Sequence, residues 1–235
     1  MLAFVLAVAT ATQTPGPLVA PPNAQPAPKS TDAADPGAFT RVHLAGDIDL
    51  DVFSSESTRA STIDCPTSQG PGLQLQVQGD TLMVTPMHEG NRTSSTCKLI
   101  LKVPTLAGIQ VSGASTVRGG ALKGLSDVQV AGAADLDLRG IQSDSFSLQV
   151  SGAGSARLSG KVDSVSLITA GAAAIQAKDL TAQTGVLKSA GAGNISATLK
   201  KSGQATSAGA GTITVYGQPE SLQQAAHGVG RIVKK

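Results

Sequence analysis

The second half of the chain repeats one short phrase seven times, a Gly-Ala or Gly-Val pair followed by small or β-branched residues. The phrases begin at Gly113, Gly132, Gly152, Gly171, Gly191, Gly209 and Gly228. Neighbouring copies are therefore 18 to 20 residues apart. Such a period is typical of a solenoid, in which each repeat forms one coil and stacking buries a continuous core. The repeat predicts an all-β fold, a parallel β-solenoid of about seven coils that is right-handed and β-helix-like.

Three columns of the repeat are mostly apolar when the copies are aligned on the glycine. Four residues before it stand Ile109, Val128, Leu148, Leu167, Leu187, Ala205 and Gln224; two before it stand Val111, Val130, Val150, Thr169, Ser189, Ser207 and Ala226; four after it stand Val117, Leu136, Ala156, Ile175, Ile195, Ile213 and Ile232. Strand residues alternate between faces, so we expect these columns to point inward and the glycine to form a corner. The second column predicts a more polar interior toward the C-terminus. Gln224 ends the first of these columns, and Lys234 ends a further mostly apolar column, six residues after the glycine. We therefore expect the last copy to cap the rod.

The chain before the repeats divides into three parts. Residues 1–11 hold a short apolar run and an Ala-Thr-Ala sequence, which predict a signal peptide without its basic start; a hydrophobic tail is the alternative. The run is too short to cross a bilayer, so we expect no transmembrane span. Residues 12–37 are rich in Pro and Ala and predict a disordered linker. Residues 38–107 alternate apolar and polar side chains, predicting a β segment with a tight turn at Gly79-Asp80 before the repeats of 108–235.

The chain has two cysteines, Cys65 and Cys97, both in the β segment that precedes the repeats. In an exported protein such a pair predicts a disulfide. Two buried thiols are the alternative. The absence of a C-x-x-C sequence gives no support to a redox motif or a thiolate metal site.

No pattern of catalytic or cofactor-binding residues stands out. The net charge of +2 disfavours nucleic acid as a partner. The Gly-x-Gly sequences lack the third glycine and the helix of a dinucleotide fingerprint, so we interpret the glycines as structural. The histidines, His43, His88 and His227, are scattered and have no neighbours at ligand spacing. We therefore expect no catalytic residue, cofactor or metal.

Carboxylates are the remaining candidates for chemistry. The column just before the third apolar column reads Thr116, Asp135, Ser155, Ala174, Asn194, Thr212 and Arg231, with one carboxylate in seven. Asp135 and Asp137 alternate on one face, but neither has a carboxylate in register in the next copy. We expect both to be solvated strand residues. A carboxylate cluster brought together from different coils, for example with Asp47, Asp49 and Asp51 of the preceding segment, would favour an enzyme.

The phrases VSGASTV, VAGAADL, VSGAGSA, SAGAGNI and SAGAGTITVYG resemble the repeats of a bacterial envelope family, the putative auto-transporter adhesin, head GIN domain. The opening FTRVHLAGDIDLDV, the junction KVPTL before IQVSG, and Tyr216-Gly217-Gln218-Pro219 are also similar to it. The resemblance covers residues 38 to 235. It implies an exported β-solenoid whose role is uncharacterised. The family's frequent corner Asp survives here only as Asp135, which weakens any repeated acidic binding stripe.

Three functions fit these observations. The first is an exported, non-enzymatic adhesion or structural module of the periplasm or cell surface, with flat Ser, Thr, Ala and Gly columns as its contact surface. Its partner would be an unknown envelope protein or glycan, with weak self-association allowed. The second is a polysaccharide-active β-helix enzyme. The third is a cytoplasmic self-assembling β-solenoid scaffold, which would require residues 1–11 not to be a signal.

Overall fold

The described strands form one open sheet with no helix among them. The structure, a computed structural model, describes residues 31–33, 38–56, 60–65, 72–87 and 97–235. Its strands are β1 (Thr31–Ala33), β2 (Arg41–Ala45), β3 (Ile48–Ser54), β4 (Ala60–Asp64), β5 (Leu73–Gln78), β6 (Thr81–Pro86), β7 (Cys97–Val103), β8 (Gly108–Gly120), β9 (Asp127–Gly191), β10 (Asn194–Gly209), β11 (Thr212–Tyr216), β12 (Ser221–Gly228) and β13 (Arg231–Lys234). The all-β prediction is confirmed for these residues.

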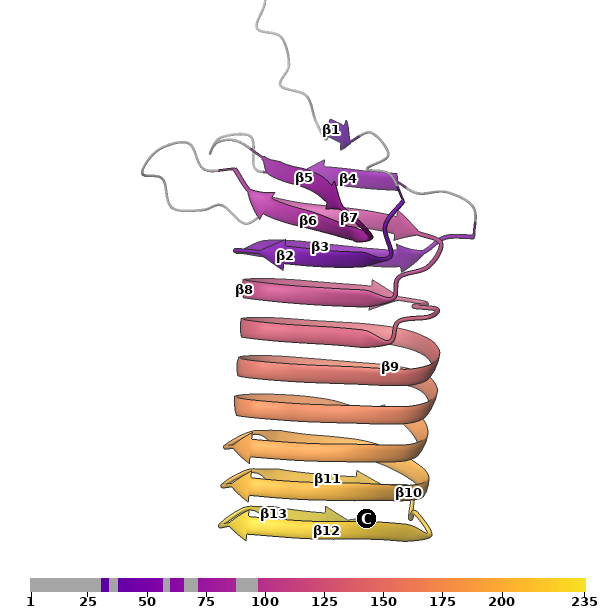
Figure 1. Ribbon diagram of the computed structural model, residues 1–235, viewed down its shortest axis with the longest axis vertical. Coiled ribbons are helices and arrows are strands. Elements are labelled where there is room, and N and C mark those ends of the chain that lie inside the picture. The colour runs from indigo at the N-terminus through magenta and orange to yellow at the C-terminus, as the bar shows by residue number, and fades with distance from the viewer. Residues whose placement is uncertain (1–30, 34–37, 57–59, 66–71, 88–96) are drawn as a thin grey trace, which may run out of the picture.

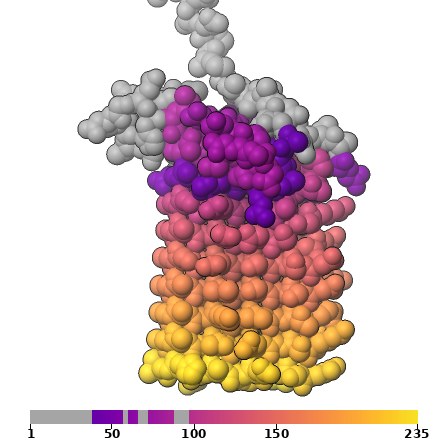
Figure 2. All heavy atoms as spheres, in the orientation of Figure 1, coloured from indigo at the N-terminus to yellow at the C-terminus, as the bar shows by residue number. Residues whose placement is uncertain are grey.

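The repeat region pairs its strands in parallel, with corner glycine against corner glycine. β8 and β9 align Gly113 with Gly132, and β10 aligns Gly209 with Gly191 of β9 and with Gly228 of β12. β11 is parallel to β10 and β13 is parallel to β11. In Figure 1 the ribbons from β8 onward lie one below another along the long axis. Figure 2 shows the colour changing in bands along this axis, so each level holds a short stretch of sequence.

The N-terminal strands make the sheet mixed rather than purely parallel. β2 and β3 pair in parallel with β8, and β3 also pairs in parallel with β7. However, β4 is antiparallel to both β7 and β1, and β5 is antiparallel to β6. The turn at Gly79-Asp80 joins β5 to β6 as predicted. Two residues suffice for an antiparallel hairpin, whereas a parallel pair needs a crossover of a dozen or more.

Several predicted features lie wholly or partly outside the described residues. Residues 1–11 and His88 are among them, as is most of 12–37. Within that last stretch the structure describes β1 (Thr31–Ala33), which pairs with β4 although its sequence predicts no ladder.

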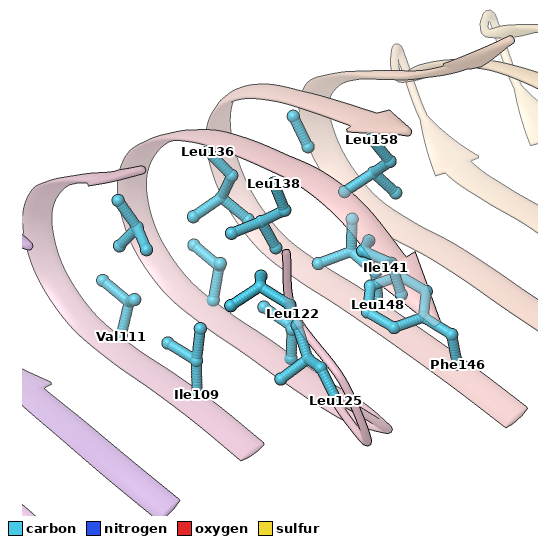
Figure 3. Close-up of a cluster of buried hydrophobic side chains, with 14 of the residues drawn as sticks. Ile109, Val111, Leu122, Leu125, Leu136, Leu138, Ile141, Phe146, Leu148 and Leu158 are labelled. Carbon is cyan, nitrogen blue, oxygen red and sulfur yellow. The ribbon is translucent and has the colours of Figure 1, made fainter. Parts of the chain in front are cut away.

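The core is one continuous cluster of mostly aliphatic side chains that extends from β2 through the repeats. Figure 3 shows part of it, where Ile109, Val111, Leu136 and Leu148 point into the same interior as Leu125. The three inward columns predicted from the repeat are buried in the first six copies. Full burial of one such Leu or Ile side chain stabilises the fold by about 1.5–3 kcal/mol. The stacked aliphatic columns are therefore the main source of stability.

The interior becomes polar toward the C-terminus, as the sequence predicts. Thr169, Ser189 and Ser207 are buried in the column that holds Val earlier in the chain. The Thr169 hydroxyl donates to Ser189 Oγ at 3.3 Å, and Ser189 Oγ donates to the carbonyl oxygen of Gly193 at 2.7 Å. Ser207 Oγ likewise donates to the carbonyl oxygen of Gly211 at 3.2 Å. A side chain at Gly211 would meet Ser189 Oγ, so the small residue makes room for the hydroxyl.

The last repeat is exposed where its predecessors are buried. β12 pairs only with β10 and β13 only with β11, so each has one sheet neighbour among the described strands. Gln224 and Ala226 are exposed, and Val229 is 86% exposed. Lys234 Nζ donates to the carbonyl oxygen of Pro219 at 2.9 Å. These features fit the terminal position expected of a cap.

Candidate functional site

The seven corner glycines have backbone angles that other residues rarely adopt. Their φ angles lie between +93° at Gly228 and +140° at Gly152. At Gly191 an added Cβ would lie 2.6 Å from the carbonyl oxygen of Gly171 in the preceding repeat. That oxygen accepts a hydrogen bond from Ala192 N at 3.0 Å. The glycines bend the chain and let neighbouring backbones approach, which is a structural role rather than a phosphate cradle.

Small exposed side chains flank these corners and form a continuous surface, here called the corner band. It comprises Ala114, Ala131, Ala133, Ser151, Ala153, Ala170, Ala172, Ala190, Ala192, Ala208 and Ala210, all exposed. The band extends over six repeats because the corners stack in register. It offers a long surface of small, uncharged side chains.

Three of the candidate carboxylates meet in a shallow groove beside the corner band. Asp47, Asp49 and Asp135 line this groove of about 480 Å³ together with small residues. Asp49 of β3 is in register with Thr116 of β8, and Thr116 is in register with Asp135 of β9. Asp49 and Asp135 are therefore separated by one intervening strand. Ser155 Oγ donates to Asp135 Oδ1 at 2.7 Å. The described residues contain no group of three His, Cys, Asp or Glu side chains that could hold a metal ion.

Asp51 and Asp137 belong to a different surface and are paired with cations. Asp51 Oδ2 lies 2.7 Å from Lys98 Nζ, and Asp51 Oδ1 lies 3.9 Å from an Arg118 guanidinium nitrogen. Arg139 donates two hydrogen bonds to Asp137, at 2.9 and 2.7 Å. This arginine, with smaller contributions from Arg157 and Arg118, holds the pKa of Asp137 below its usual value. The pKa of Arg139 is raised in turn by Asp137.

This surface, here called the arginine face, follows two outward columns of the repeat, five and seven residues after the corner glycine. Its members are Asp51, Phe53, Lys102, Arg118, Asp137, Arg139, Arg157, Ser159, Gln176, Lys178, Ser196, Thr198, Tyr216 and Lys235. The strand alternation that buries Leu136 and Leu138 turns the residues between and beside them outward. A groove of about 410 Å³ lies on this face between Arg139, Arg157 and Lys178.

The arginine face is not among the sites predicted from the sequence. The signal was nevertheless available, because aligning the fifth and seventh residues after each glycine brings Arg118, Asp137 and Arg157 into one column and Arg139 and Lys178 into the other. The contribution of Asp51 and Lys102 was not readable in this way, since both precede the repeats and their register comes from the sheet.

The other predicted residues are dispersed or serve the framework. His43 Nε2 lies 3.1 Å from Ser112 Oγ, and His227 is exposed in β12. Cys65, just after β4, and Cys97, at the start of β7, are joined by a disulfide with a Cα–Cα distance of 4.5 Å. No helix in the described part of the chain could span a membrane.

A family model for the putative auto-transporter adhesin, head GIN domain, matches residues 38–219. The chain belongs to this family. The match includes the N-terminal strands from β2 onward and all repeats but the last, so the strands on either side of residue 108 belong to one family domain. Comparison with the curated proteins gave no match.

Solved structures of bacterial proteins share the fold of this family member. A Bacteroides fragilis protein described as a putative adhesin is 22% identical, with 89% of this chain and 99% of that chain covered and a TM-score of 0.77. A Parabacteroides distasonis protein described as a putative lipid binding protein is 21% identical, with 90% and 98% covered and a TM-score of 0.62. A Parabacteroides merdae putative adhesin is 20% identical, with 88% and 96% covered and a TM-score of 0.59. At these identities the likeness concerns the fold alone.

Proposed function

We propose that this chain is an exported, non-enzymatic adhesion or structural module of a bacterial cell envelope. In this proposal residues 108–235 form a right-handed parallel β-solenoid of about seven coils, and the rod presents its faces to an envelope protein or glycan. The observation that carries it is the in-register stacking of the corners, from Gly113 against Gly132 to Gly209 against Gly228. Stacking repeats one outward side chain at each level, which produces long contact surfaces rather than a single enclosed pocket.

The state of the carboxylates supports binding over catalysis. A general acid in a polysaccharide-cleaving enzyme needs a raised pKa, so that it still carries its proton near neutral pH. The pKa of Asp137 is instead lowered by Arg139. Asp135 accepts a hydrogen bond from Ser155, and Asp51 is paired with Lys98. Each of these three carboxylates therefore has a partner within the fold, which suits a structural role.

The paired cysteines support export. Disulfides persist in oxidising compartments and are rare in the cytosol. We propose that the Cys65–Cys97 bond forms after export and fastens β4 to the start of β7. A cytoplasmic scaffold would keep both thiols reduced.

Fractionation of cells that express the tagged full chain tests this function. We expect the protein in the periplasm or at the surface, with Cys65 and Cys97 protected from alkylation until a reductant is added. The purified protein should bind isolated envelope material and should release no oligosaccharide from acidic polysaccharides. Cytosolic retention with both thiols free would overturn the export proposal, and sustained release of sugar products would overturn the non-enzymatic one.

A further inference from the structure

We propose that the arginine face binds an acidic polysaccharide that lies along the rod. This inference rests on the proposed function, because it needs the chain to meet envelope glycans outside the cytoplasm. It names the face and the ligand class that the proposed function leaves open.

The arginine face concentrates positive charge that the whole chain does not have. Its six cations are Lys102, Arg118, Arg139, Arg157, Lys178 and Lys235. Three carboxylates lie among them, Asp51 and Asp137 in the same columns and Asp179 at the groove, so these residues carry a net charge of +3, whereas the whole chain carries +2. The cations at the groove are also accessible, since Arg157 and Lys178 are exposed. Such a surface attracts a polyanion.

The unpaired cations lie at the groove. Arg157 is exposed and forms no ion pair or hydrogen bond within the described part of the chain. Lys178 lies 5.3 Å from the centre of the Tyr216 ring and likewise has no carboxylate partner there. Both line the groove of about 410 Å³ with the polar residues Ser159, Gln176 and Ser196, and the carboxylates of Asp137 and Asp179 line it as well. An anionic group of a ligand can therefore reach two cations without displacing an existing ion pair.

Aromatic rings provide a second, independent feature of the same face. The chain has five aromatic residues; Phe39 and Phe146 are buried, and Phe4 lies outside the described residues. The remaining two, Phe53 and Tyr216, both lie in the column seven residues after the corner glycine or in register with it. Phe53 is 42% exposed and Tyr216 is partly exposed. Aromatic rings stack on the apolar C–H faces of sugar rings, so their position beside cations suits a charged glycan.

The carboxylates on this face favour a glycan over a nucleic acid. Asp51 and Asp137 alternate with Arg118 and Arg157 along one column, where neighbouring strands are about 4.8 Å apart. A nucleic-acid backbone carries one phosphate per nucleotide and would meet these carboxylates repeatedly. An acidic polysaccharide carries hydroxyl groups between its anionic groups, and a hydroxyl can donate to the carboxylate of Asp137.

Calorimetric titration of the purified full chain with polygalacturonate tests the inference, with neutral dextran as the uncharged polymer. We expect binding to polygalacturonate that weakens with added salt, because screening acts on exposed charges, and no binding to dextran. The variant Arg157→Gln/Lys178→Thr introduces residues found at the same repeat positions one copy later, Gln176 and Thr198, so the fold should tolerate it. Removal of one exposed cation should weaken binding by up to about fivefold, so we expect the double variant to bind about five- to twentyfold more weakly.

A matched control removes the same charge elsewhere. Lys161 and Lys188 are exposed and lie outside the arginine face; Lys188 is in register with Thr206. Lys161→Gln/Lys188→Thr should leave binding within about twofold of the unsubstituted protein. Equal losses in the two double variants would show a non-specific charge effect and overturn the assignment to this face. Phe53→Ser should also weaken binding although it changes no charge.

The outcomes separate the inference from the proposed function. Tighter binding of single-stranded oligothymidylate, or of anionic phospholipid vesicles, than of polygalacturonate would overturn the glycan assignment. If the chain is exported and binds envelope material but not polygalacturonate, the inference fails while the proposed function stands. Cytosolic retention would refute the proposed function whatever the titration shows.

Discussion

Substitution of one corner glycine by alanine tests whether close stacking of the repeats holds the fold together. Gly191 has a φ of +111°, and its substitution would place a Cβ 2.6 Å from the carbonyl oxygen of Gly171. The strained backbone costs about 1–3 kcal/mol, and loss of the Ala192 hydrogen bond to that oxygen costs about 1 kcal/mol more. We therefore expect Gly191→Ala to lower the free energy of unfolding by about 2–4 kcal/mol.

Gly124 offers a control in which the backbone is strained but the space is open. Its φ is +77°, and an added Cβ would meet no atom within 4 Å. Gly124→Ala should therefore cost only the backbone strain, about 1–2 kcal/mol. The free energies come from guanidinium denaturation followed by circular dichroism, read from the midpoint at constant m value. Hydrogen exchange adds a local measure, since the Ala192 amide should lose protection in Gly191→Ala alone.

The stacking argument fails if the two alanine variants are equally destabilised, or if Ala192 keeps its protection in Gly191→Ala. Either result would mean that the backbones of neighbouring repeats separate easily enough to accept a methyl group. The glycines would then be needed only for their φ angles.

The other predictions concern the disulfide, the polar interior and one titrating group. Reduction of Cys65–Cys97, or its replacement by two serines, should lower the free energy of unfolding by about 3 kcal/mol, measured by denaturation with and without reductant. Ser189→Ala should cost about 1–3 kcal/mol in the same measurement, because the buried Gly193 carbonyl and Thr169 hydroxyl lose their partner, and an unchanged midpoint would contradict this. The Asp137 carboxyl should titrate below its ordinary pKa of about 3.9 in an NMR pH titration, and Arg139→Gln should raise that value. Its stabilising effect should be complete above pH 3.9 or so and disappear as the pH falls through the lowered folded-state pKa.

The repeat predicted which side chains are buried, because a given repeat position has the same surroundings in nearly every copy. The column of Leu148 and Leu187 is buried up to the last copy, where Gln224 is exposed. The change from Val150 to Thr169 in the next column marks where the interior becomes polar. A side chain inside a stacked coil meets its own counterparts above and below, so its surroundings can be read from the sequence column alone.

The N-terminal pairing was not predictable in the same way. The sequence Ala60–Asp64 has one large apolar residue, Ile63, and nothing in it distinguishes an antiparallel neighbour of β7 from another parallel strand. Alternation reports which face is buried, and it is silent on the direction of the partner. The ion pair of Asp51 with Lys98 depends on the long-range pairing of β3 with β7, so it also could not be derived from the sequence.

The charge pattern of the arginine face reflects two competing demands. Cations in register on neighbouring strands would repel one another at about 4.8 Å, and Asp137 between Arg118 and Arg157 relieves that repulsion. The same carboxylate occupies the Arg139 guanidinium with two hydrogen bonds and so withholds it from a ligand. Arg157 follows the last carboxylate of this column, whose next members are Gln176 and Ser196, and Lys178 lies in the neighbouring column. The face is thus most stable where its charges alternate and most able to bind where the alternation ends, which places the ligand contact at the groove between Arg157 and Lys178.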